Sequence, residues 1–320
     1  MSARGWVLFA AMSVIWGIPY LLIKIALEGL SVPVLVLART LIGAAVLLPL
    51  AVSRTNIASV IAHWKPLLAF AFFEIIAAWL LLSNAEHHLS SSTTGLLIAA
   101  SPIIATVLDR ITGGTHRLGA GRWAGLVVGI VGVAVLAGPG LSGGGAWPIA
   151  QVLLVATCYA IAPLIAARRL TGVPALPLTA SCLAVAALVY AVPAALRWPT
   201  EMPSTRVLVA TVLLAVVCTA LAFIVFFALI REVGPTRALV FTYVNPAVAL
   251  AAGVVILAEP LTVFNVAGLA LILVGSVLAT RRSAGEPVPA PPVVGDGAPD
   301  YGCGVTDGPA VGRSRCGRRR

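Results

Sequence analysis

The chain has 320 residues, of which 60% are hydrophobic and 10% are charged, and its formal net charge at pH 7 is +10. With a mean hydropathy of +1.05, these values exclude an ordinary soluble domain, in which about a quarter of the residues are charged. They do not indicate nucleic-acid binding either, because the basic residues lie between long apolar stretches and in the C-terminal tail, as in polytopic membrane proteins.

Ten apolar segments follow one another along the chain, and each is long enough to cross a hydrocarbon core of roughly 30 Å as a helix. The first is too long for a cleaved signal peptide and no small-residue cleavage site follows it, so we expect it to remain in the membrane. The sequence therefore predicts an all-α integral membrane protein with ten transmembrane helices. The predicted spans are residues 6–27, 32–52, 66–83, 92–108, 121–138, 147–167, 175–196, 206–230, 237–258 and 262–280.

The second half of the chain repeats the pattern of the first half. Pro102, for example, corresponds to Pro246 at a separation of 144 residues. A single repeat of this length indicates one duplication rather than a solenoid. We therefore predict two five-helix units, over residues 5–139 and 146–282. Because each unit has an odd number of spans, the second unit would be inverted relative to the first, and inverted repeats usually enclose a site near the bilayer midplane.

Glycines form a small-residue face on the fifth predicted span, where Gly125, Gly129 and Gly132 lie on one side of the helix. Such faces allow two helices to approach closely in lipid. We expect a close helix contact there, and the alternative is that these glycines face lipid.

Lys and Arg residues in the short loops predict the orientation of the chain in the membrane. With the N-terminus in the cytoplasm, twelve of them lie inside and only Arg197 and Arg206 lie outside. We therefore predict a multi-pass protein of the cell membrane (plasma or inner) with both termini cytoplasmic. Residues 283–320 are rich in Pro and Gly and end in a cluster of arginines, which predicts a disordered basic cytoplasmic tail.

Short motifs recur in a fixed order along the predicted spans. They are Trp16-Gly17, Lys24, Arg39, Ser101-Pro102, Tyr243-Val244-Asn245-Pro246, the turn Ala258-Glu259-Pro260-Leu261-Thr262, and the glycines Gly268 and Gly275. In these motifs and their spacing, the chain resembles the EamA-like transporter family of the drug/metabolite transporter superfamily over about residues 5–282. The resemblance implies ten-helix carriers that mostly export small metabolites, amino acids or toxic compounds. In the first unit, Thr115-His116-Arg117-Leu118 stands where that family usually has Gly-Glu-Arg-Leu, so His116 takes the place of the glutamate.

Enzyme signatures are absent from the sequence, which contains no HExxH, paired CxxC, GxSxG or phosphate-binding Gly-rich motif. Glu86-His87-His88 is the nearest approach to a metal cluster, but adjacent side chains on a helix point about 100° apart. We therefore expect no metal, no cofactor and no enzymatic activity. A membrane-embedded transferase would need acidic or His residues clustered at one interface, and the sequence shows no such cluster.

Paired helix interruptions are the best sequence pointer to a binding site between repeats. Pro19 and Pro163 form one matched pair, and Pro102 and Pro246 form another. We expect these four prolines to interrupt their helices around a cavity, because such breaks are tolerated where a cavity or a neighbour satisfies the freed carbonyls. The cavity would lie among the first, fourth, sixth and ninth spans. The third and eighth spans would complete its wall, partly on the ground of the family resemblance.

Polar and aromatic residues inside the spans are candidates for the pathway of a substrate or of protons. The tryptophans and tyrosines either line a cavity or only pack, and Lys24 either belongs to the pathway or extends its ammonium to the interface. Arg39 either contacts substrate or pairs structurally, while Glu259 is expected to be a turn or cap residue. Besides Glu74, discussed next, the candidates are Trp16, Lys24, Arg39, Trp79, Ser101, Tyr159, Tyr243 and Asn245.

Glu74 is the strongest candidate because it lies about eight residues into the third predicted span, which is roughly 12 Å deep. A carboxylate there costs about 2.5–3.5 kcal/mol unless it faces a cavity, is paired or takes up a proton. Three interpretations stay open. Glu74 carries a coupling proton, binds a cationic group of the substrate, or pairs with Arg39.

These observations together predict a secondary transporter that exports small polar or amphipathic metabolites, including amino-acid-like compounds, by alternating access. Within transport, the alternative is uptake or facilitated diffusion of the same compounds. From other classes, the alternatives are a membrane-embedded enzyme and a non-transporting receptor. The expected partners are the lipid bilayer and a small-molecule substrate, with proton coupling as one of the alternatives for Glu74, and the oligomeric state stays open.

Overall fold

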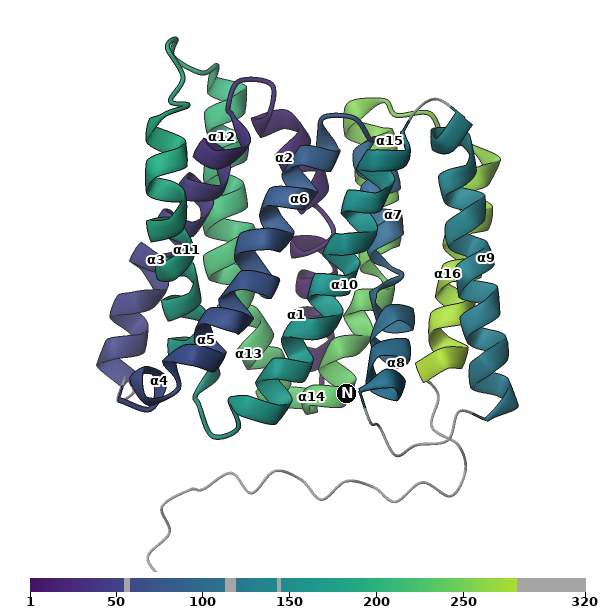
Figure 1. The fold of residues 1–320 in the computed structure, drawn as a ribbon, viewed down its shortest axis with the longest axis horizontal. Coiled ribbons are helices and arrows are strands. Elements are labelled where there is room, and N and C mark those ends of the chain that lie inside the picture. The colour runs from purple at the N-terminus through teal and green to yellow at the C-terminus, as the bar shows by residue number, and fades with distance from the viewer. Residues whose placement is uncertain (55–57, 113–118, 143–144, 281–320) are drawn as a thin grey trace, which may run out of the picture. The chain divides into compact units, whose positions relative to one another are not determined.

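The structure is a computed structural model, and it describes residues 1–54, 58–112, 119–142 and 145–280. Within these ranges every regular element is a helix (Figure 1), in agreement with the predicted all-α fold class. Nine helical segments in the described residues are long and apolar enough to cross a membrane. The predicted tail, residues 283–320, and the turn that contains His116 lie outside the described residues.

Five of the spanning segments are continuous α-helices: α3 (Val32–Arg54), α9 (Ala120–Ser142), α10 (Ala146–Arg169), α11 (Ala175–Ala195) and α16 (Val263–Thr280). The other four are composite. They are α1 (Ala3–Ile15) with α2 (Pro19–Ala26), α5 (Trp64–Ala71) with η1 (Phe72–Ile76) and α6 (Ala77–Glu86), α7 (Ser91–Ile98) with α8 (Ser101–Ile111), and α12 (Thr205–Ala215) with η2 (Val216–Leu221) and α13 (Ala222–Val233). The short α4 (Ala58–Ala62) precedes α5.

The ninth predicted span, residues 237–258, is not one helix. It consists of α14 (Pro235–Ala238), a 3-10 turn η3 (Leu239–Tyr243) and α15 (Asn245–Leu257). Because α15 has 13 residues, it is shorter than the roughly 20 residues that cross a bilayer. The described residues therefore hold nine segments of spanning length and one shorter apolar helix, where the sequence predicted ten spans.

Three of the four singled-out prolines follow a helix break. α1 ends at Ile15 before Pro19, α7 ends at Ile98 before Pro102, and η3 ends before Pro246. Proline has no amide for the carbonyl four residues earlier, and its ring crowds the preceding turn. The predicted interruption at Pro163 is wrong, because α10 continues through it to its end.

Pro19 and Pro163, which form one matched pair, differ in the residues that precede them, although alanines also precede Pro102, where the helix does break. Gly17 stands just before Pro19, and glycine weakens a helix by about 1 kcal/mol relative to alanine. Ala160 and Ala162 precede Pro163, and alanine is the best helix former. α10 therefore tolerates the single bond that Pro163 removes, and α11 likewise runs through Pro193.

Two π-helices occupy corresponding positions in the halves of the chain. η1 contains Glu74 and η2 contains Cys218, and these residues are 144 apart, which is also the separation of the repeat. In η2 the Thr219 hydroxyl donates to the Leu214 carbonyl five residues earlier, at 3.0 Å. π-Turns are rare and frequent at functional sites, so their matched placement marks the middle of both composite segments.

The glycine face of α9 packs directly on α16. A Cβ atom built on Gly275 would lie 2.5 Å from the Cα of Gly129, and one on Gly125 would lie 2.4 Å from the amide nitrogen of Ala279. The two backbones therefore touch, and only hydrogen atoms fit between them. This confirms the close helix contact expected at the glycine face, and Figure 1 shows α9 and α16 side by side.

The tryptophans divide into two groups. Five of the seven are between 55% and 64% exposed and lie near helix starts or just after a helix: Trp6, Trp64, Trp123, Trp147 and Trp198. Tryptophan is enriched at membrane interfaces, where one side of its ring is apolar and the other is wet. The two that remain, Trp16 and Trp79, lie inside the bundle.

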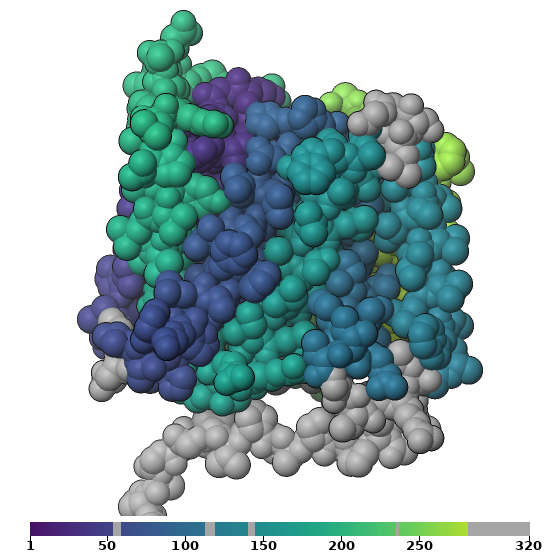
Figure 2. Space-filling model, in the orientation of Figure 1, coloured from purple at the N-terminus to yellow at the C-terminus, as the bar shows by residue number. Residues whose placement is uncertain are grey.

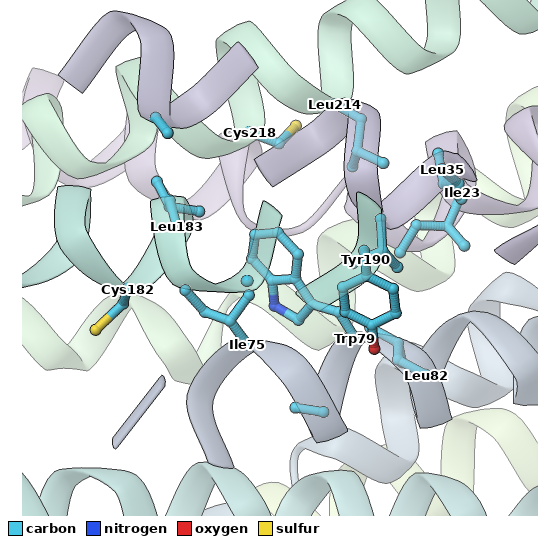
Figure 3. Close-up of a cluster of buried hydrophobic side chains, with 14 of the residues drawn as sticks. Ile23, Leu35, Ile75, Trp79, Leu82, Cys182, Leu183, Tyr190, Leu214 and Cys218 are labelled. Atoms are coloured by element: carbon cyan, nitrogen blue, oxygen red, sulfur yellow. The ribbon is translucent and has the colours of Figure 1, made fainter. Parts of the chain in front are cut away.

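The largest buried cluster joins α2, α3, α6, α11 and α12. Figure 3 shows Trp79 in this cluster together with Ile75, Leu82 and Tyr190. The Tyr190 hydroxyl donates to the Ile76 carbonyl at 2.7 Å and so ties α11 to η1. Other close pairs are α3 with α11, α7 with α15, α2 with α12, and α6 with α10, the last pair being visible side by side in Figure 2.

Candidate substrate cavity

A cavity of about 320 Å³ lies where the helix breaks and the π-helices meet. Its size falls at the lower end of the range for small-molecule sites, roughly 300–1,000 Å³. Apart from Lys24, every residue that the sequence singled out for the site lines it. These are Trp16, Pro19, Arg39, Glu74, Trp79, Ser101, Pro102, Tyr159, Pro163, Tyr243, Asn245 and Pro246. The structure thus brings together residues spread over more than 230 positions of the chain.

Aromatic rings make up much of the wall. Trp16 lies against Phe226 at 5.2 Å, Phe241 at 5.4 Å and Phe223 at 5.8 Å between ring centroids. Trp16 therefore both packs and lines the cavity, so the two roles considered for it are combined. The ring edges and faces give the cavity a largely apolar surface on which a flat or amphipathic molecule can lie.

Arg39 is the cation of the cavity wall and is held from two sides. Its guanidinium carbon lies 3.5 Å from the centroid of the Trp79 ring, and its Nε donates to the Thr219 hydroxyl at 2.8 Å. Cation–π stacking and a hydrogen bond together fix the plane of the guanidinium. The side chain is only 8% exposed, and the Nη groups are the donors left for a ligand, because the described bonds engage Nε alone.

Glu74 contributes the carboxylate of the cavity wall. It is part-buried in η1, and in the described residues no hydrogen bond or ion pair is made by its side chain. The interpretation in which Glu74 pairs with Arg39 is therefore not what the structure shows. Tyr159, Cys158 and Cys182 lie within electrostatic reach of its charge. An acidic group is thus presented to the cavity without a partner.

Ser101 and Asn245 stabilise the helix breaks. The Ser101 hydroxyl donates to the Ile98 carbonyl at 2.6 Å, and this is the carbonyl that would bond the amide that Pro102 lacks. With its amide oriented by hydrogen bonding, the Asn245 nitrogen donates to the carbonyls of Ser13 at 3.2 Å and Phe241 at 3.1 Å. The Ser101 hydroxyl thus satisfies the carbonyl that Pro102 leaves free, and Asn245 adds a bond to the Phe241 carbonyl, which also accepts from the Val244 amide at 2.8 Å.

Two other residues considered from the sequence, Lys24 and Glu259, form hydrogen bonds to backbone groups at helix ends. Lys24 does not line the cavity, and its ammonium donates to the carbonyls of Glu86 at 2.5 Å and Leu89 at 2.7 Å. Glu259 is a cap, as expected, because its carboxylate accepts from the amides of Ser91 at 2.7 Å and Ser92 at 2.9 Å at the start of α7. A carboxylate at a helix N-terminus is favoured by the helix dipole. Neither residue touches the space where a substrate would lie.

Sequence reasoning missed several wall residues, of which Tyr20, Cys218 and Phe223 are the most informative. A signal for two of them existed in the repeat. Cys218 stands 144 residues after Glu74, and Phe223 stands 144 residues after Trp79. Applying the repeat to the candidates of the first half would have found both.

The fold is that of a multi-pass helical membrane protein, and the cavity lies among its helices. A model of the EamA-like transporter family matches residues 3–138 and 146–281, so nearly the whole described chain is covered. The chain belongs to the EamA-like transporter family.

Named relatives agree with this membership. An uncharacterized transporter of Archaeoglobus fulgidus is 24% identical over 287 residues, which cover 87% of this chain and 99% of the relative. The uncharacterized transporter YvbV of Bacillus subtilis is 24% identical over 294 residues, which cover 89% and 94% of the two chains. A solved crystal structure has a TM-score of 0.62 and 21% identity, with 87% of this chain and 98% of that chain covered, and it shares the fold.

Proposed function

We propose that the protein is a secondary exporter of small amino-acid-like or amphipathic metabolites that works by alternating access. The observation that carries the proposal is the cavity, which combines an aromatic lining with one cation, Arg39, and one unpaired carboxylate, Glu74. A molecule with both an anionic and a cationic group would satisfy both side chains at once. Its apolar part would lie on the aromatic rings.

The membrane architecture that we propose is ten helices arranged as two inverted five-helix repeats, with α14, η3 and α15 together as the ninth. The helix contacts support it. α2 packs on α12 of the second half, and α10 packs on α6 of the first half in the corresponding way. The pairs α3 with α11, α7 with α15 and α9 with α16 join corresponding helices. Such a pattern is expected when two copies of one unit pack against each other about a pseudo-two-fold axis.

Alternating access would then be a rocking of the two repeats about the cavity. The helix breaks at Pro19, Pro102 and Pro246 provide points where the wall can bend without the loss of further helical hydrogen bonds. The orientation that fits the loop charges has both termini on the cytoplasmic side of the cell membrane.

Transport by the purified full-length protein in proteoliposomes tests the proposal. We expect counterflow of labelled zwitterionic amino acids or amphipathic amines, and competition among them. Arg39→Lys keeps the charge but loses the planar stack on Trp79, and we expect it to weaken substrate binding by about tenfold or more. Arg197→Lys, the same substitution at an exposed arginine after α11, is the matched control and should behave as the parent. Absence of flux for every compound class in a well-folded preparation would contradict the proposal.

Proton coupling through Glu74 is part of the proposal, and its support is the unpaired carboxylate at the cavity wall. Glu74→Gln preserves shape and removes the charge. If the group carries the coupling proton, this variant should still exchange substrate but lose net transport driven by a pH gradient. If the group binds a cationic part of the substrate instead, exchange itself should weaken. Gradient-driven flux equal to that of the parent, at equal protein amount, would exclude the relay.

The direction of transport separates export from the uptake alternative. Loading substrate on the side of the chain termini should give the faster flux under a physiological gradient if the protein is an exporter. Faster flux in the opposite direction would favour uptake or facilitated diffusion of the same compounds.

A further inference from the structure

A second polar layer lies at one end of the helices, just beyond the cavity. This end layer consists of Lys24, Glu86, Ser91 and Glu259. Three of its members stand four residues from cavity-lining residues on the same helices, which are Tyr20 on α2, Leu82 on α6 and Gly95 on α7. Four residues make about one helical turn, or roughly 6 Å, on the same face of a helix. The end layer therefore closes the cavity toward the ends of α2 and α6.

Specific bonds hold the end layer together. The Lys24 ammonium joins α2 to the end of α6 through two backbone carbonyls. Glu259 joins the turn after α15 to the start of α7, with the Ser92 hydroxyl as a further donor at 2.5 Å. Gly253 makes room for this turn, because a Cβ there would meet the Glu259 carboxylate. The layer thus connects the first half of the chain to the second.

Glu86 is the unexplained member of this layer. Its exposed fraction is 0%, and neither carboxyl oxygen has a hydrogen-bond partner. Within the described residues, the unpartnered buried side-chain oxygens are these two and the Ser91 hydroxyl, and all three belong to the end layer. Lys24 and Glu259 direct their own hydrogen bonds elsewhere, to backbone groups and Ser92. A buried carboxylate without partners is far more costly than a neutral carboxyl group.

We propose that Glu86 is a proton-binding site, which holds a proton while the end layer is closed and releases it when that end of the cavity opens. On opening, water reaches the side chain, the O–H bond of the acid breaks, and the proton passes to a water molecule as hydronium. The carboxylate that stays behind is then hydrated and within reach of the Lys24 ammonium. Closing reverses the transfer, so one proton is bound and released for each opening.

The titratable groups around Glu86 come from three elements. Lys24 and Tyr20 face it from α2, and Glu259 faces it from the turn after α15. His87 follows it outside the membrane segment, where burial, His88 and Lys24 lower the pKa of its imidazole. α3, α7 and α10 also pack on α6, and among the described residues they bring no charged group to Glu86. His87, its neighbour His88 and the proposed coupling carboxylate Glu74 are therefore competing sources of a pH response, and the experiment must include all three.

The experiment measures how pH opens this end of the cavity, and it needs no substrate. All five cysteines of the full-length chain are replaced, and a single cysteine is placed at Ile98, which lines the cavity below the end layer. An impermeant thiol reagent is applied in vesicles from the side of the α6–α7 turn. A second single-cysteine protein, at Met202, which is 89% exposed, gives the intrinsic pH dependence of the thiol reaction.

The labelling rate of the cysteine at position 98 is divided by that of the cysteine at position 202. In the parent this ratio should rise with pH, by up to about tenfold per pH unit, because opening is linked to release of one proton. Glu86→Gln, which imitates the protonated acid, should label slowly at every pH. His87→Gln and His88→Gln should each keep the parent's pH response, and so should Glu74→Gln, because Glu74 lies outside the end layer. Glu259→Gln should label faster at every pH because it loosens the cap, yet still respond to pH. A melting temperature for Glu86→Gln close to that of the parent at acidic pH would show that the variant is folded.

Three results would overturn the proposal: a labelling rate that does not change with pH in the parent, an unchanged pH response in Glu86→Gln, and a response that follows sodium concentration instead of pH. The proposal for Glu86 rests on the proposed function in one respect, which is that the cavity is the substrate site. Labelling is independent of flux, so a protein that transports nothing could still show the switch, and a transporter could lack it.

Discussion

The contact between α9 and α16 permits a sharp prediction, because two glycines on these helices have different surroundings. A Cβ on Gly275 would meet backbone, 2.4 Å from the nitrogen and 2.5 Å from the Cα of Gly129. A Cβ on Gly129 would instead meet the end of the Ile103 side chain at 2.1 Å, with the Gly275 Cα at 3.7 Å. A side-chain end can rotate away, whereas a backbone atom moves only if the whole helix moves.

Gly275→Ala should therefore force α16 away from α9 by about 1–1.5 Å, which would restore an ordinary contact of roughly 3.5–4 Å. Overpacking of this kind costs about 1–3 kcal/mol. Alanine recovers about 1 kcal/mol through its better helix propensity. The net loss in the free energy of unfolding should lie between about 0 and 2 kcal/mol. Moving α16 away also separates the contacts at Gly125 and Gly132, so we expect a loss in the upper part of that range.

The full-length protein in detergent is heated to a series of temperatures, and the fraction that stays folded is measured by size-exclusion chromatography. Gly138→Ala, on the same helix pair but with open space around its Cβ position, is the matched control and should be as stable as the parent or more stable. Gly129→Ala should fall between the two. A Gly275→Ala protein that is as stable as Gly138→Ala would refute the argument that backbone contact limits this interface.

Three further predictions follow from the remaining structure. Glu259→Gln should lower the melting temperature through a loss of about 1 kcal/mol at the α7 cap, and an unchanged melting curve would mean that the carboxylate charge is not needed there. Deletion of residues 283–320 should leave membrane insertion and transport intact, and loss of flux at equal abundance would contradict this. A single cysteine placed in residues 143–145 should react with an impermeant reagent from outside the cell, since the loop charges predict that side, and labelling only from the cytoplasm would reverse the orientation.

Nine of the ten expected membrane segments and most of the cavity wall could be predicted from the sequence, because both depend on local properties. The length of an apolar run decides whether a helix crosses the membrane, and a proline removes one identifiable hydrogen bond. The four matched prolines do line one cavity, and Trp16, Glu74 and Tyr159 line the same cavity. The same argument failed at Pro163, where α10 continues without a break, so a proline alone does not decide whether a helix is interrupted.

The roles of single side chains were beyond the sequence, because they depend on partners distant in the chain. Nothing in the sequence around Arg39 indicates that it stacks on Trp79 and bonds to Thr219. The π-helix at Glu74 was also invisible, since Phe72–Ile76 has the composition of an ordinary membrane helix. Glu86 was considered with its neighbouring histidines at a helix end, whereas the fold buries it completely.

The two halves of the chain have π-helices at corresponding positions, but they do not share the charged residues of the cavity. At the π-helices, Glu74 in the first half corresponds to Cys218 in the second, and the position that corresponds to Arg39 is Leu183. Both charged groups of the cavity therefore belong to the first half. If the halves rock as proposed, a substrate bound to these groups stays with the first half while the wall of the second half moves over it. A ligand shifts a conformational equilibrium only through its differential affinity for the two states. Any bias between the inward and outward states would then come from the uncharged second-half wall, with Phe223 and Tyr243, and from the protons that we propose on Glu74 and Glu86.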